Sequence, residues 1–135
     1  MEFSNILLGH LVGDYLLQNK WMAIGKSSNF CNCCIHVLVY TFSVLIFTSF
    51  DLLWAMSIFL PHFLIDRYSL ADKWLSFINS RSLGDFILNG KQNIPQNMDF
   101  ENYHVLRGGF TALVYAVADN TLHLICLWYF AKIIL

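Results

Sequence analysis

Histidine and aspartate recur in pairs four residues apart. The pairs are His10 with Asp14, His62 with Asp66 and, in reverse order, Asp119 with His123. With five histidines and nine acidic residues in the chain, fewer than one such pair is expected by chance. Residues four apart share one face of a helix, so each pair can offer two side chains to one site.

Imidazole nitrogen and carboxylate oxygen together suit a divalent metal such as Zn, Mn or Fe. The spacing therefore predicts a metal site whose ligands come from His10, Asp14, His62, Asp66, Asp119 and His123. His36 is a further candidate, as a ligand or a proton shuttle, and Asp119 and His36 are the candidate catalytic residues. Together these seven candidates exceed the four ligands that one tetrahedral metal ion takes. They suit either a two-metal site or one metal with outer-shell residues and a general base.

The composition predicts that these residues lie in a membrane. Only 13% of the 135 residues are charged, against about 25% in soluble proteins, while 57% are hydrophobic and the mean hydropathy is +0.54. A single soluble domain of this size needs more charge to cover its surface, so the composition argues against a free-standing soluble enzyme. The net charge of −1 offers no basic excess for binding nucleic acid.

Apolar stretches predict an all-α, polytopic membrane protein forming one domain over residues 1–135. We expect about four transmembrane helices, over residues 3–19, 31–50, 51–66 and 110–131. Asp51 is suited to cap the third helix. Gly9 and Gly13 form a G-x-x-x-G step that lets a neighbouring helix approach closely.

The polar segment 67–109 is predicted to be a cytoplasmic loop containing a short interfacial helix that begins near Ser69. Leu70, Trp74 and Phe77 fall on one face of that helix. Seven of the eight basic residues lie in this segment or in the first loop, and only Lys132 lies elsewhere. The positive-inside rule therefore predicts an inner-membrane protein with both termini outside the cytoplasm.

An aspartate at the centre of a bilayer costs about 2.5–3.5 kcal/mol, so Asp14 and Asp119 require partners. Two alternatives to a metal site stay open. Each pair can be a local hydrogen bond within its helix, or the set can form a proton relay or ion path. Three cysteines near His36 (Cys31, Cys33 and Cys34) are weaker candidates for metal binding or palmitoylation.

Several motifs resemble a family of small bacterial and phage membrane proteins, domain of unknown function 3307. They are the run from Gly9 to Gln18, then Trp21, Met22, Ala23 and Lys26, then His36, the H-F-L-I-D element His62–Asp66, and Asp119 to His123. The last element carries Asn120 where the family has Gln. The resemblance covers all four apolar stretches but not Leu70–Gly108. It implies a polytopic membrane protein, and its pattern is similar to that of membrane-bound metal-dependent hydrolases.

Two classes of function follow. The first is a metal-dependent hydrolase that is embedded in the lipid bilayer and acts on a lipid or phosphoester at the cytoplasmic interface. The second is a non-enzymatic membrane protein, either a proton or metal-ion conduit or a small membrane partner of a larger complex.

Overall fold

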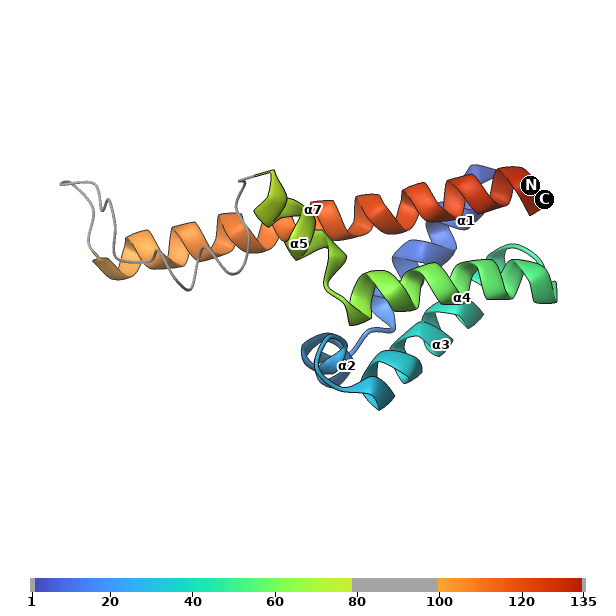
Figure 1. Cartoon of the computed structure of the whole chain (residues 1–135), viewed down its shortest axis with the longest axis horizontal. Helices are drawn as coiled ribbons and strands as arrows, with labels where there is room; N and C mark the ends of the chain where they lie inside the picture. The colour runs from blue at the N-terminus through green and yellow to red at the C-terminus, as the bar shows by residue number, and fades with distance from the viewer. Residues whose placement is uncertain (1, 79–99, 135) are drawn as a thin grey trace. The chain divides into compact units, whose positions relative to one another are not determined.

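The computed structural model describes residues 2–78 and 100–134, and within these residues the regular structure is helical, with short connections between the helices. In chain order the elements are α1 (Phe3–Leu11), η1 (Val12–Leu16), α2 (Lys20–Gly25), α3 (Phe30–Phe47), α4 (Leu52–Arg67), α5 (Leu70–Phe77) and α7 (Phe100–Ile134), shown in Figure 1. The all-α prediction is confirmed for these residues. They divide into two compact units. The first contains the chain up to Ser69 together with the segment from Leu122 onward, and the second contains Leu70–Thr121.

Three helices of the first unit begin at an Asn or Asp cap. The side chain of Asn19 accepts a hydrogen bond from Met22 N at the start of α2, and Asn29 accepts bonds from two backbone amides at the start of α3. Asp51 caps α4, as predicted, by accepting a hydrogen bond from Trp54 N at 2.9 Å. These caps satisfy amides that have no partner within the helix, and they fix where each helix begins.

Replacement of Asp51 by Ala is expected to lower the free energy of unfolding by about 1 kcal/mol, because the amide of Trp54 loses its acceptor. Thermal unfolding in detergent measures this loss. Asp51→Asn is the matched control, since asparagine caps as well as aspartate and should leave the stability unchanged. Equal destabilisation by both variants would contradict the assignment of a cap.

α1 and the following η1 approach α3 closely at the two glycines, as the G-x-x-x-G step predicts. A Cβ at Gly9 would lie 2.8 Å from Val44 Cα, and one at Gly13 would lie 2.8 Å from Tyr40 Cδ2. The hydroxyl of Ser43 donates to the carbonyl oxygen of Gly9 at 3.0 Å. This contact brings the C-terminal part of the first helix against the part of α3 that carries Tyr40.

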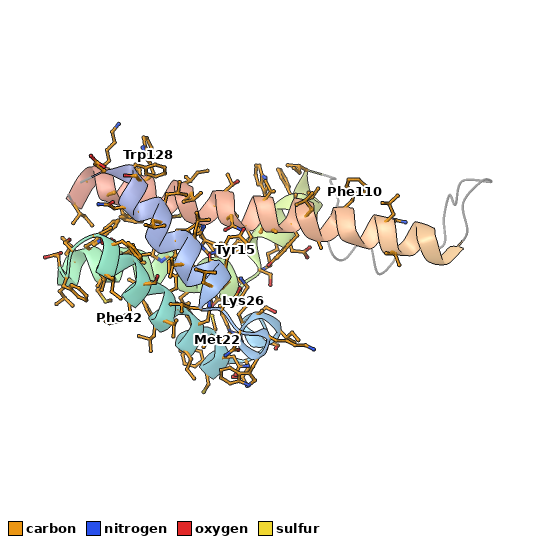
Figure 2. All side chains as sticks on the ribbon, turned by 180° about the vertical axis from the view of Figure 1, so that it is seen from behind. Tyr15, Met22, Lys26, Phe42, Phe110 and Trp128 are labelled. Atoms are coloured by element: carbon orange, nitrogen blue, oxygen red, sulfur yellow. The ribbon has the colours of Figure 1, made fainter. Side chains whose placement is uncertain are left out.

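A hydrophobic cluster adjoins the polar residues through Tyr40. Its buried members are Ile6, Tyr40, Val44, Trp54, Ile58 and Leu127, from α1, α3, α4 and α7. The indole of Trp54 donates to Thr48 Oγ1 at 2.9 Å, which joins the end of α3 to the start of α4. Other large apolar side chains project outward, including Phe42 and Trp128, which are about half exposed (Figure 2). The first unit therefore exposes apolar side chains as well as burying them.

Two of the described helices are long and apolar enough to cross a membrane, over Phe30–Phe47 and Val105–Ile134. The expected four spans are therefore not confirmed. The other two segments are shorter, because α1 with η1 covers Phe3–Leu16 and α4 covers Leu52–Arg67.

The predicted loop 67–109 differs from the structure at both ends. A positive φ of 48° at Ser69 separates α4 from α5, and α5 confirms a helix at the predicted place. Its predicted apolar side chains, Leu70, Trp74 and Phe77, are exposed. α7 begins at Phe100, ten residues earlier than expected, because Gly108 and Gly109 are tolerated inside a helix at about 1 kcal/mol each. The part of the loop over residues 79–99 lies outside the described residues.

Candidate metal centre

The first ligand candidates come from a helix that changes its winding. α1 passes directly into η1, a π-helical turn in which Leu17 N donates to Val12 O at 3.0 Å, five residues back. Asp14 lies in this turn and His10 lies one turn before it. Single π-helical turns inside helices occur frequently at functional sites. The predicted pairing is confirmed, with His10 Nδ1 3.5 Å from Asp14 Oδ2.

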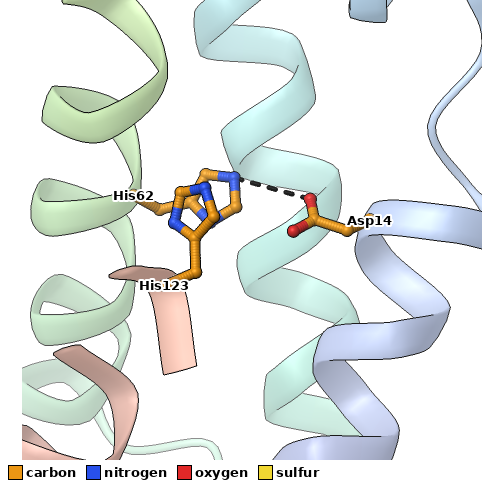
Figure 3. Close-up of side chains that lie close together, drawn as sticks. All are labelled: Asp14, His62 and His123. Atoms are coloured by element: carbon orange, nitrogen blue, oxygen red, sulfur yellow. Dashed lines mark ion pairs between the residues drawn. The ribbon is translucent and has the colours of Figure 1, made fainter. Parts of the chain in front are cut away.

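The second pair lies near the C-terminal end of α4. His62 Nε2 is 3.2 Å from Asp66 Oδ2, so these residues share a face as predicted, and both are buried. α3 runs beside α4 and contributes His36, which is fully buried. His123 comes from the part of α7 that belongs to the first unit. Its ring stacks on that of His62 with centroids 3.9 Å apart, and Asp14 faces both rings (Figure 3).

Four ligand atoms from three segments converge on one point. His36 Nε2 lies 3.0 Å from Asp66 Oδ2 and 3.3 Å from Asp14 Oδ1. His62 Nε2 lies 3.2 Å and 3.6 Å from the same two oxygens. The two Nε2 atoms are 3.0 Å apart. These side chains, with His123, are called the metal centre below.

These separations match those between ligands that share a metal ion. With metal–ligand distances of about 2.1 Å, neighbouring ligands lie about 3.0 Å apart in an octahedron and about 3.4 Å apart in a tetrahedron. Asp14 Oδ1 and Asp66 Oδ2 make no hydrogen bond of good geometry, although imidazole nitrogens surround them. Close approach without hydrogen-bond alignment is the arrangement expected of atoms directed at a common cation. Two of the sets that could hold a metal ion are His36 with His62 and Asp66, and Asp14 with His62 and His123.

The charges in the centre also favour a cation. Asp66 is buried, and the side chain of Asp14 is only 10% exposed. One ammonium, Lys26 Nζ, lies 2.7 Å from Asp66 Oδ1. With neutral histidines the two carboxylates outnumber the ammonium, which leaves one negative charge to be compensated in a place largely removed from water. A divalent cation or a protonated histidine would compensate it.

A family model described as a protein of unknown function, DUF3307, matches residues 3–135. The chain belongs to the DUF3307 family. The match includes Leu70–Gly108, which the motif resemblance did not cover. No curated protein and no solved structure matches this DUF3307 protein.

Three predicted site residues of this DUF3307 protein lie differently from the converging set. His10 Nδ1 lies 2.8 Å from the phenol oxygen of Tyr40, so His10 reaches the centre through Tyr40 and the outer oxygen of Asp14. His123 Nε2 lies 3.4 Å from Asp66 Oδ1, the oxygen that also faces Lys26. Asp119 is buried one turn before His123 in α7, but it belongs to the second unit.

Sequence reasoning missed two residues that contact the centre. Tyr40 is fully buried, and its ring packs on that of His62 with centroids 3.7 Å apart. Its spacing of four from His36 in an uncharged helix was the available signal. Lys26 was counted toward topology and the family resemblance but not toward the site, because nothing local connects it with Asp66, forty residues later.

The cysteines do not join the converging set. Cys33 is buried with its sulfur 4.0 Å from the carbonyl oxygen of Phe63, whereas Cys31 is exposed and Cys34 is partly buried. A small cavity of about 10 Å³, room for about one water molecule, lies beside His62 and His123 and is also lined by Ser57 and Cys126.

Proposed function

We propose that this protein is a membrane-embedded, metal-dependent hydrolase that acts on a lipid or phosphoester at the membrane interface. The observation that carries the proposal is the convergence of His36 Nε2, His62 Nε2 and two carboxylate oxygens at separations of 3.0–3.6 Å. Neutral imidazole and carboxylate in this number suit Zn, Mn or Fe. A local His–Asp hydrogen bond within each helix would explain each residue pair by itself. It would not explain why Asp14, from the first pair, lies beside His36 and His62 of other helices.

Membrane insertion is supported by the distribution of polarity in the first unit. Its interior holds His10, His36, His62 and Asp66, all at most 2% exposed. Its exterior holds apolar stripes at helical spacing, Leu38, Phe42 and Ile46 on α3 and Leu53, Met56, Leu60 and Leu64 on α4. A polar interior with an apolar exterior suits a hydrocarbon solvent, in which only the inside can satisfy polar groups.

The depth of the centre supports an interfacial substrate. His36 lies six residues into α3, about 9 Å from its first residue, and Asp66 lies in the last turn of α4. The same end of this helix pair carries Arg67, and Lys26 reaches Asp66 there. Cationic side chains at this end suit the anionic surface of the cytoplasmic leaflet and a phosphate group of a substrate.

The chemistry would divide between metal and side chains. Asp14, His36, His62 and Asp66 would hold a divalent ion, which would supply an activated water molecule and polarisation of the bond to be cleaved. A base is needed to take the proton of that water. Within the first unit the candidate is His123, which borders the small cavity.

Metal content tests the proposal directly. Protein purified in detergent is expected to retain one divalent ion per chain. Removal by a chelator should lower the melting temperature, and Zn²⁺ or Mn²⁺ should restore it. The loaded protein should release phosphate or alcohol from phospholipid vesicles, and His62→Ala should abolish both metal retention and release. Wild-type protein that carries no stoichiometric metal, and gains no thermal stability from either ion, would sink the proposal.

A non-enzymatic metal-binding membrane protein is the second candidate. The centre is buried, and structural metal sites are closed by protein in this way, whereas catalytic sites keep one position open. The two candidates separate in the same experiment. Stable metal binding without release from phospholipids or simple phosphoesters favours the second.

A further inference from the structure

The two oxygens of Asp66 face different partners. Oδ2 faces His36 Nε2 at 3.0 Å and His62 Nε2 at 3.2 Å, within the converging set. Oδ1 faces away from that set, toward Lys26 Nζ at 2.7 Å and His123 Nε2 at 3.4 Å. A carboxylate in this arrangement has a ligand direction on each side, as in sites where it bridges two metal ions.

On the Oδ1 side of Asp66, the separation of the facing groups fits a second cation position. The 3.4 Å between His123 Nε2 and Asp66 Oδ1 equals the separation of two ligands on one tetrahedral metal, about 3.4 Å. The cation that the structure places on Oδ1 is the ammonium of Lys26.

The backbone on both sides of Lys26 is fixed. Gly25 packs so tightly on Asn32 that a Cβ there would lie 1.9 Å from Asn32 Nδ2, and this amide donates to the carbonyl oxygen of Trp21. On the other side, Arg67 donates to the carbonyl oxygen of Ser27. The side chain of Lys26 is 14% exposed. The backbone that carries Lys26 is therefore anchored by contacts that do not depend on a bound ion, and from there the ammonium reaches Asp66.

We propose that the Lys26 ammonium takes the second cation position of the metal centre and thereby limits the centre to a single metal ion. The inference rests on the proposed metal site, and it decides between the one-metal and two-metal arrangements that the sequence leaves open. Electrostatics gives the reason. An ammonium already in contact with Oδ1 repels a second divalent ion at the same oxygen, and this repulsion is strong where water is largely excluded.

Metal stoichiometry tests the inference. Apo-protein in detergent is loaded with Mn²⁺, freed of excess ion, and studied by elemental analysis and electron paramagnetic resonance. Wild type is expected to hold one Mn²⁺ per chain with the spectrum of an isolated ion. Lys26→Met removes the charge and keeps the volume. It is expected to hold two ions, a twofold rise, with the signal of a coupled pair about 3.5–4 Å apart.

Two controls isolate the charge. Lys26→Arg keeps the cation and should hold one ion, and Lys20→Met removes an exposed lysine of α2 and should also hold one. Lys26→Gln repeats the charge removal if the Met variant does not fold. Wild type with two ions, or charge-removal variants with one or none, would overturn the inference while leaving the metal site in place. Wild type without metal would instead refute the proposed function.

Discussion

Asp66→Asn is expected to abolish metal retention, lowering the affinity for Zn²⁺ or Mn²⁺ more than about 100-fold. Asp66 approaches all three histidines of the centre, at 3.0, 3.2 and 3.4 Å. Loss of an outer-shell partner alone costs about 10–100-fold in metal affinity, so loss of this ligand should exceed that range. Elemental analysis after purification, and titration of the apo-protein, measure the effect.

The same change is expected to destabilise the fold. It leaves the Lys26 ammonium, 14% exposed, facing a neutral amide, and removal of one partner of a buried ion pair costs about 3–5 kcal/mol. The double variant Asp66→Asn/Lys26→Met removes the stranded charge, so it should recover stability but not metal. Asp51→Asn, the same chemical change at an exposed cap, should alter neither. Retention of wild-type metal by Asp66→Asn would show that the ligands lie elsewhere.

Gly9→Ala is expected to lower the free energy of unfolding by about 1–3 kcal/mol, because its Cβ would lie 2.8 Å from the backbone of Val44 and 3.4 Å from Ser43 O. Backbone cannot move aside as a side chain can, so α1 should shift away from α3. His10 is the next residue and Asp14 follows one turn later, so metal affinity should fall together with stability. Chemical denaturation in detergent and metal titration measure the two effects.

The control for this change is another helical glycine. A Cβ at Gly109 in α7 meets nothing within 4 Å. Gly109→Ala should therefore raise helix stability by about 1 kcal/mol, the usual gain over glycine, and leave metal binding unchanged. A stabilising Gly9→Ala would mean that the close approach of α1 and α3 does not hold.

Spacing along one helix predicted the pairs within the site, because residues four apart share a face whatever surrounds them. His10 with Asp14 and His62 with Asp66 therefore followed from the sequence alone. Lys26 did not follow, since its contact with Asp66 depends on how the loop after α2 folds against the end of α4.

Helix ends were predictable where a cap stands at the boundary and uncertain elsewhere. Asp51 fixed the start of α4, but the apolar stretch that begins at Phe110 predicted a helix start that the structure places at Phe100. The number of spans followed from hydropathy alone, and hydropathy does not decide whether a stretch of 14–16 residues crosses a bilayer or only reaches into it.

The π-helical turn over Val12–Leu16 makes the length of this segment as important as its composition. Its wider winding accommodates one residue more than an α-helix needs to cover the same rise. If one residue were lost there, the turn could close to ordinary α geometry, and the side chains within the turn would change direction while the segments on either side kept theirs. Asp14 would then point away from His36 and His62 although every ligand type was still present. Homologous chains that keep the centre should therefore tolerate changes of side chain at Tyr15 or Leu16, which are exposed, more readily than a single insertion or deletion between Gly13 and Leu17.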